Sequence, residues 1–142
     1  MAKAVTFKAQ DVLGKDFTIV DTFSNIKKID AGMENIFSAI DKVDKEKSDN
    51  ATFMQYNDAI SEQVIIETGK LLDLTKTDTK KLESMPYSDV FAFYSEAVDK
   101  FLGMEVPSVQ KMQQRIKKVT EQIDQPEEEE NKGEDPKSSE EG

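Results

Sequence analysis

The spacing of the apolar residues changes along this chain from a period of two to a period of about 3.6. Near the amino terminus, Val5 and Phe7 alternate with polar neighbours, and a second β-branched and aromatic run covers residues 12–20. Residues 14–16, Gly-Lys-Asp, interrupt that run with a sequence typical of a turn. The pattern therefore predicts two short strands within residues 3–20, joined as a hairpin centred on residues 14–16.

This predicted hairpin needs a packing partner. A two-stranded ribbon is only marginally stable in water, because it buries little apolar surface. We therefore expect it to pack on helices of the same chain or on strands of another subunit. The second arrangement would make the protein a homo-oligomer, and the sequence leaves both open.

After Asp21 the apolar residues recur at spacings of three and four, which predicts helices. The first predicted helix ends at a polar break over residues 44–50, and the second runs from 51 to 72. A short helical piece at 80–85 is expected to end at Pro86, because proline interrupts a helix. The apolar face of the first helix consists of Ile26, Ile29, Met33, Ile36, Phe37, Ile40 and Val43.

The next predicted helix, residues 87–102, has the widest apolar face and the most aromatic side chains. Gly103 is placed to cap its carboxyl end, since glycine readily adopts the left-handed conformation found there. This helix is therefore predicted to supply the centre of the core. The side chains expected at that centre are Phe91, Tyr94, Val98 and Phe101.

The helix predicted after Pro107 has a narrower apolar seam with polar flanks. The seam spans about two heptads, which is too short for a stable coiled coil alone. We expect it either to pack into the domain or to stay available for a partner helix. The predicted partner-binding residues are Val109, Met112, Ile116, Val119 and Ile123.

Residues 124–142 contain no Val, Ile, Leu, Met or aromatic residue. Nine acidic and two basic side chains give them a net charge of −7, out of −10 for the whole chain. A segment with nothing apolar to bury cannot offset the entropy lost on ordering, so we expect it to be disordered. The predicted fold is therefore mainly α with a short N-terminal β-hairpin (α+β). It comprises one domain of about four helices at residues 1–123 and an acidic tail at 124–142.

The chain contains neither His nor Cys. This excludes disulfides, Cys/His zinc sites and imidazole-based catalytic triads. Carboxylates remain, but their cluster at residues 41–49 lacks the Gly and the bidentate Glu of a calcium loop, so we interpret it as solvated. We therefore expect no enzyme, no cofactor and no metal site. The acidic balance argues against nucleic-acid binding, and no apolar run approaches the roughly 20 residues of a membrane span.

Residues 12–30, VLGKDFTIVDTFSNIKKID, resemble the opening of tail assembly chaperones of long-tailed (siphovirus-type) bacteriophages of Gram-positive hosts. Those proteins often begin with a Gly-Lys hairpin and a β run, followed by a helix that carries Lys and an acidic residue. The compact helical body, the helix at residues 87–102 and the charged end are also similar in organisation.

The resemblance implies a non-enzymatic role in viral tail assembly in the host cytoplasm. Such chaperones bind the tape measure protein, keep its long hydrophobic helices soluble and assist tail-tube polymerisation around it. The expected partners are thus the tape measure protein and the tail-tube protein. The alternative is another small acidic protein-interaction factor: a scaffold, an antitoxin or an inhibitor that mimics nucleic-acid charge.

Overall fold

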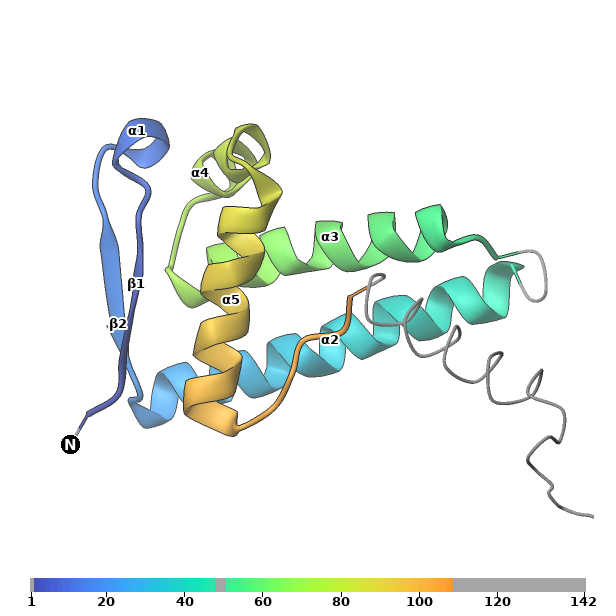
Figure 1. Cartoon of the computed structure of the whole chain (residues 1–142), viewed down its shortest axis with the longest axis horizontal. Helices are drawn as coiled ribbons and strands as arrows, with labels where there is room; N and C mark the ends of the chain where they lie inside the picture. Colours follow the sequence, from blue (N-terminus) through green and yellow to red (C-terminus); the bar gives the residue numbers. More distant parts are fainter. Residues whose placement is uncertain (1, 48–50, 109–142) are drawn as a thin grey trace, which may run out of the picture. The chain divides into compact units, whose positions relative to one another are not determined.

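The structure, a computed structural model, describes residues 2–47 and 51–108. The described part is mainly helical, with a short two-stranded antiparallel sheet at its amino terminus, as the sequence predicts (Figure 1). The residues up to Pro107 form a compact unit. The predicted seam helix, the domain boundary predicted after residue 123 and the predicted acidic tail lie outside the described residues.

The two strands, β1 (Ala4–Phe7) and β2 (Phe17–Val20), pair antiparallel, with Val5 opposite Ile19. Side chains alternate between the two faces of the ribbon. The face toward the helices carries Val5 and Phe7 of β1 and Phe17 and Ile19 of β2. The inward side chains of β1 are buried, and those of β2 are half-buried. The predicted strand pair is therefore confirmed, and it packs through β1.

The connection between the strands corrects the predicted tight turn at residues 14–16. A helical turn, α1 (Gln10–Leu13), lies between the strands and ends at Gly14, whose φ of 84° is left-handed. Asp16 holds the loop, because its carboxylate accepts hydrogen bonds from the backbone N–H groups of Ala9 (3.0 Å) and Gln10 (3.2 Å). Gly14 thus terminates a helical turn, and the second strand begins only at Phe17.

The longest helix, α2 (Phe23–Lys47), is capped at its amino end by Thr22. The hydroxyl of Thr22 accepts a hydrogen bond from the backbone N–H of Asn25 at 3.1 Å, which satisfies a free donor of the first turn. The helix continues past Val43 into the predicted polar break, where Lys45, Glu46 and Lys47 have good helix propensity.

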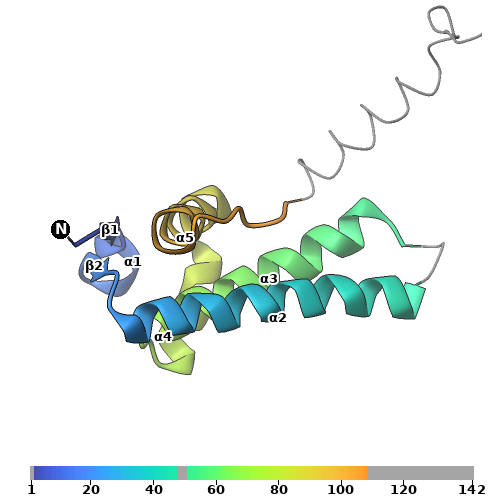
Figure 2. The ribbon, with the colours of Figure 1, turned by 90° about the horizontal axis from the view of Figure 1, so that it is seen from below.

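The next helix, α3 (Phe53–Leu71), lies beside α2 and runs in the opposite direction (Figures 1 and 2). It starts with a capping box, in which Thr52 and Gln55 each bond the other's backbone N–H. The observed range agrees with the predicted helix at residues 51–72.

The short helical piece predicted at residues 80–85 begins earlier than expected. It consists of α4 (Lys76–Lys81) followed by a 3₁₀ turn, η2 (Leu82–Ser84). The hydroxyl of Thr75 caps α4 by accepting a hydrogen bond from the backbone N–H of Asp78 at 3.1 Å. The predicted interruption at Pro86 is confirmed.

The helix α5 (Tyr87–Leu102) crosses one face of the α2–α3 pair and also packs against β1 (Figure 2). It ends at Gly103 with a φ of 67°, as predicted. The predicted core centre needs one correction, because Phe91 and Phe101 are only half-buried. Phe93 is buried instead, and its ring centroid lies 4.9 Å from that of Phe7 on β1. The buried residues of α5 are Val90, Phe93, Tyr94, Ala97 and Val98.

Candidate functional site

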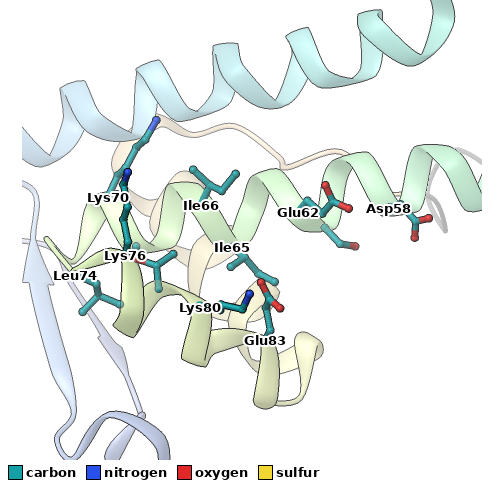
Figure 3. A pocket seen from close by; sticks show the side chains of 12 residues that line it. Asp58, Glu62, Ile65, Ile66, Lys70, Leu74, Lys76, Lys80 and Glu83 are labelled. Carbon is teal, nitrogen blue, oxygen red and sulfur yellow. The ribbon is translucent and has the colours of Figure 1, made fainter. Parts of the chain in front are cut away.

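A groove of about 760 Å³ lies between α3 on one side and α4 with η2 on the other (Figure 3). Its apolar surface comes from Ile65, Ile66 and Leu74. Ile66 is 42% exposed, and the other two side chains are half-buried. The groove therefore presents branched aliphatic side chains to solvent.

The close approach of α4 to α3 depends on Gly69. A Cβ atom at this position would lie 2.6 Å from Cγ2 and 2.9 Å from Cβ of Thr79, closer than carbon atoms can approach. The Thr79 hydroxyl is held in place, because it donates a hydrogen bond to the carbonyl oxygen of Thr75 at 2.8 Å. Any larger residue at position 69 would move α4 and change the width of the groove.

The turn from α3 into α4 is also held by local contacts. The backbone N–H of Leu74 donates to the carbonyl oxygen of Gly69 at 2.9 Å. Asp73 adopts a left-handed conformation with φ 56°, and its carboxylate pairs with Lys28 of α2 at 2.9 Å. These contacts hold a sharp turn in the chain, so that α4 runs back along α3.

Four of the charged side chains around the groove are separated by sign along its length, while Lys80 and Glu83 lie beside each other (Figure 3). Asp58 and Glu62 lie toward one end, and Lys70 and Lys76 lie toward the other (Figure 3). A helix laid along the groove would match this arrangement, with its positive amino end at the acidic side and its negative carboxyl end at the basic side. The charged lining residues are Asp58, Glu62, Lys70, Lys76, Lys80 and Glu83.

A separate polar cluster is buried where α2 and α3 meet. Glu67 of α3 is only 3% exposed. One of its carboxylate oxygens, Oε2, accepts hydrogen bonds from Asn35 Nδ2 at 3.0 Å and Gln63 Nε2 at 2.5 Å. Lys70 Nζ lies 3.7 Å from the same oxygen. These contacts offset the cost of removing the carboxylate from water.

Tyr94 of α5 borders this cluster, and its hydroxyl is buried with no hydrogen-bond partner among the described residues. The hydroxyl faces Gly32 of α2, where a Cβ atom would overlap it. Burial, and secondarily the charge of Glu67, raises the pKa of Tyr94 well above its ordinary value. The phenol is therefore neutral at physiological pH, and its place is between helices rather than in the groove.

The seam residues that the sequence predicts as partner-binding lie outside the described residues, and their role stays a prediction. They are Val109, Met112, Ile116, Val119 and Ile123. The α3–α4 groove was not predicted. The sequence holds three consecutive apolar residues there, Val64, Ile65 and Ile66, and three neighbouring helical positions cannot all face the same core. That excess of apolar residues was the available signal.

Within residues 2–47 and 51–108, no group of three or more acidic side chains is placed to hold a metal ion. No helix in this part of the chain is long and apolar enough to cross a membrane. Comparison with models of protein families, with curated proteins and with solved structures finds no match to the chain.

Proposed function

We propose that this chain is a tail assembly chaperone, which binds an amphipathic helix of the tape measure protein and keeps that protein soluble while the tail tube polymerises. The observation that carries the proposal is the α3–α4 groove, which exposes Ile66 between an acidic and a basic end. The choice of the tape measure protein as the client comes from the resemblance at residues 12–30.

The apolar side chains of the groove can contact one face of a helix. Helical residues three and four apart place their side chains about 5–6 Å from each other on one face. Two or three apolar side chains of a client helix can therefore contact Ile65, Ile66 and Leu74. A contact this small gives moderate affinity, because association must first overcome the loss of translational and rotational freedom. Moderate affinity suits a chaperone, which has to release its client.

The charged side chains of the groove affect the orientation of the bound helix more than its affinity. Exposed ion pairs are each worth about 0–1 kcal/mol, but their arrangement favours one direction of the bound helix over the other. Lys70 and Lys76 favour the carboxyl end of the client helix, and Asp58 and Glu62 favour its amino end. The charge of −7 on residues 124–142 also makes complexes repel one another, which opposes aggregation of the bound client.

Co-expression with the tape measure protein tests the proposal, with the soluble fraction of that client as the measurement. We expect Ile66→Asp to reduce the soluble client severalfold, because it places a charge on the apolar surface of the groove. The matched control is Phe37→Asp, which changes an apolar side chain of similar exposure (45%) on α2, outside the groove. The control should protect the client as the parent does.

A second variant separates the groove from the predicted seam. Ile116→Asp combined with Val119→Asp removes two seam anchors. Loss of protection in this variant alone would place the client on the seam and remove the groove from the proposal. A client that stays insoluble with the unaltered chain would contradict the chaperone function and favour the alternative of another acidic interaction factor.

A further inference from the structure

The strand β2 is the exposed edge of the sheet. The helix α5 packs against β1, and Figure 1 shows β2 on the outside of the described part. Residues 17–20 are Phe-Thr-Ile-Val, and their register with β1 has no bulge. Edge strands usually prevent pairing with other chains by means of Lys, Pro, a bulge or a covering element. The four residues of β2 have none of these features within the described structure.

The strand pairing determines which backbone groups of β2 point outward. The backbone N–H of Asp21 donates to the carbonyl oxygen of Lys3 at 3.1 Å, and hydrogen-bonded pairs alternate along an antiparallel ladder. Thr18 and Thr6 therefore form a non-hydrogen-bonded pair, which agrees with the 3.0 Å between their hydroxyls. It follows that Thr18 and Val20 direct their N–H and C=O groups away from β1.

Most of these outward groups are unused. The carbonyl of Val20 accepts hydrogen bonds from the backbone N–H of Thr22 at 2.8 Å and from Asn25 Nδ2 at 2.9 Å. The N–H of Val20 and both backbone groups of Thr18 point away from β1, and among the described residues no hydrogen bond outside the strand pairing involves them. A strand added along this edge would satisfy them.

The side chains of β2 also leave apolar surface at this edge. Val5 and Phe7 of β1 are buried, whereas their partners Ile19 and Phe17 are only half-buried. An added strand with apolar residues at alternate positions would continue the inward-facing layer and cover these two side chains.

We propose that a second copy of this chain occupies the edge, with β2 pairing antiparallel to β2 about a two-fold axis at Thr18. In this register, Phe17 of one copy lies opposite Ile19 of the other, so the apolar layer continues across the axis. Lys15 and Asp21 flank β2 on either side, so Lys15 of each copy lies near Asp21 of the other. Both ends of the pairing are therefore matched in charge.

The neighbouring registers that keep the same hydrogen-bond phase lack this match. A shift by two residues in one direction places Asp21 opposite Phe17, and a shift in the other places Lys15 opposite Ile19. Exposed charge pairs contribute little energy, but opposed charges are an effective means of selecting register. Charge complementarity thus favours a second copy over a strand of arbitrary sequence, and it specifies how that copy pairs.

The symmetric arrangement also limits assembly to two copies. The resulting sheet has four strands, and its two outer strands are both β1. Each β1 is flanked by α5, where Lys100 Nζ donates to the carbonyl oxygen of Ala4 at 3.3 Å. One outward carbonyl of each outer strand is therefore already bonded to α5, and an isologous contact of this kind closes as a dimer. This inference does not depend on the proposed chaperone function, because the pairing leaves the α3–α4 groove unused.

Cysteine cross-linking tests the register, because the chain has no Cys and a single introduced thiol is unique. In the proposed dimer the two copies of Thr18 form a hydrogen-bonded pair with Cα atoms about 5.5 Å apart, within the range of a disulfide. Thr18→Cys should therefore form a covalent dimer under mild oxidation at least about tenfold faster than chance encounter allows.

The matched control for the cross-link is Thr6→Cys. Thr6 is exposed on the same face of the sheet, and its hydroxyl contacts that of Thr18. The two copies of Thr6 would nevertheless be three strand spacings apart, about 14 Å, which no disulfide can span. Equal cross-linking rates for Thr18→Cys and Thr6→Cys would overturn the proposal.

Sedimentation equilibrium of the full chain provides a measurement without cross-linking. At about 100 µM, the unaltered chain should sediment with twice the mass of one copy, as a short strand contact of micromolar affinity predicts. Thr18→Lys should be monomeric, because it places like charges opposite each other at the axis, while Thr6→Lys should remain dimeric. Circular dichroism of both variants tests whether they are folded. A monomeric parent, or equal dimerisation of the two variants, would refute the pairing.

Discussion

Gly32 of α2 has no Cβ atom, and this leaves room for the hydroxyl of Tyr94. A Cβ atom at residue 32 would overlap the Tyr94 hydroxyl, and the next nearest atom would be Glu67 Oε1 at 3.1 Å. The contact is therefore specific to one oxygen atom, and removing that oxygen should make room for a methyl group.

We expect Gly32→Ala to lower the free energy of unfolding by about 1–3 kcal/mol through overpacking. In a chain that already carries Tyr94→Phe, the same substitution should cost much less, since the overlapping hydroxyl is gone. Urea unfolding of the two single variants and the double variant measures the coupling. Additive effects would show that the hydroxyl does not limit the space at residue 32.

The raised pKa of Tyr94 predicts a loss of stability at alkaline pH. The folded chain holds the phenol neutral, while the unfolded chain ionises it near the ordinary pKa of 10.0. The stabilisation is therefore complete below pH 10 and is lost as the pH rises above it, by about 1.4 kcal/mol per pH unit. Tyr94→Phe should flatten this part of the pH profile, as followed by urea unfolding between pH 9 and 11. A profile as steep as that of the parent would assign the loss to other groups.

At the scale of elements, the packing of α5 on the sheet decides which aromatic residues are in the core. Phe91 and Phe93 are two positions apart on the same helix. The helical period favoured Phe91, together with Tyr94 and Val98, but the sheet places Phe7 against Phe93. The apolar face of α5 is therefore wide enough to contact both the α2–α3 pair and β1.

Alanine substitution along α5 should reflect this arrangement. Phe93→Ala is expected to cost about 3–5 kcal/mol, because it removes a buried ring and its contact with Phe7. Phe91→Ala, the matched control on the same helix, should cost clearly less, because Phe91 is half-buried. Urea unfolding gives both values. A larger loss for Phe91→Ala would contradict the packing described here.

The contact between α3 and α4 predicts a linked effect on stability and client binding. Gly69→Ala should cost about 1–3 kcal/mol, because its methyl group would overlap Thr79. It should also reduce the soluble client in co-expression, since α4 forms one wall of the groove. Adding Thr79→Ala removes two of the three overlapping atoms and should recover part of the stability. No recovery in the double variant would show that the helices separate for another reason.

At the scale of the whole molecule, the last described segment closes the compact unit. Val106 is buried beyond the end of α5, and the unit extends to Pro107. A chain that ends at Pro107 retains every residue of this unit and should unfold cooperatively. A chain that ends at Gly103 lacks Val106 and should lose about 1.5–3 kcal/mol, the worth of burying one such side chain.

A third chain, ending at Ile123, tests the boundary that the sequence predicts. Thermal unfolding compares it with the chain that ends at Pro107. A higher melting temperature for the longer chain would extend the domain to residue 123, as predicted. Equal melting temperatures would place the end of the cooperative unit at Pro107.

The features that the sequence determined are those specified by neighbouring residues. The range of α3, its capping box at Thr52 and Gln55 and the glycine cap of α5 at Gly103 each depend on residues within one or two turns. Alternation of Val5 and Phe7 with polar residues likewise predicted the first strand, and a β-branched and aromatic run predicted the second. The helical turn α1 was missed, because Asp16 stabilises it from outside the turn itself.

Only the tertiary structure decided the features that depend on residues distant in the sequence. The groove exists because Gly69 admits Thr79, which no local pattern reveals. Phe93 is buried because α5 meets a strand more than 80 residues earlier in the chain. The exposed edge of β2 likewise follows from α5 packing against β1 instead of β2. Periodicity shows that a face of a helix or strand is apolar. Which element packs against that face depends on long-range contacts, because the chain adopts the arrangement that buries the most apolar surface.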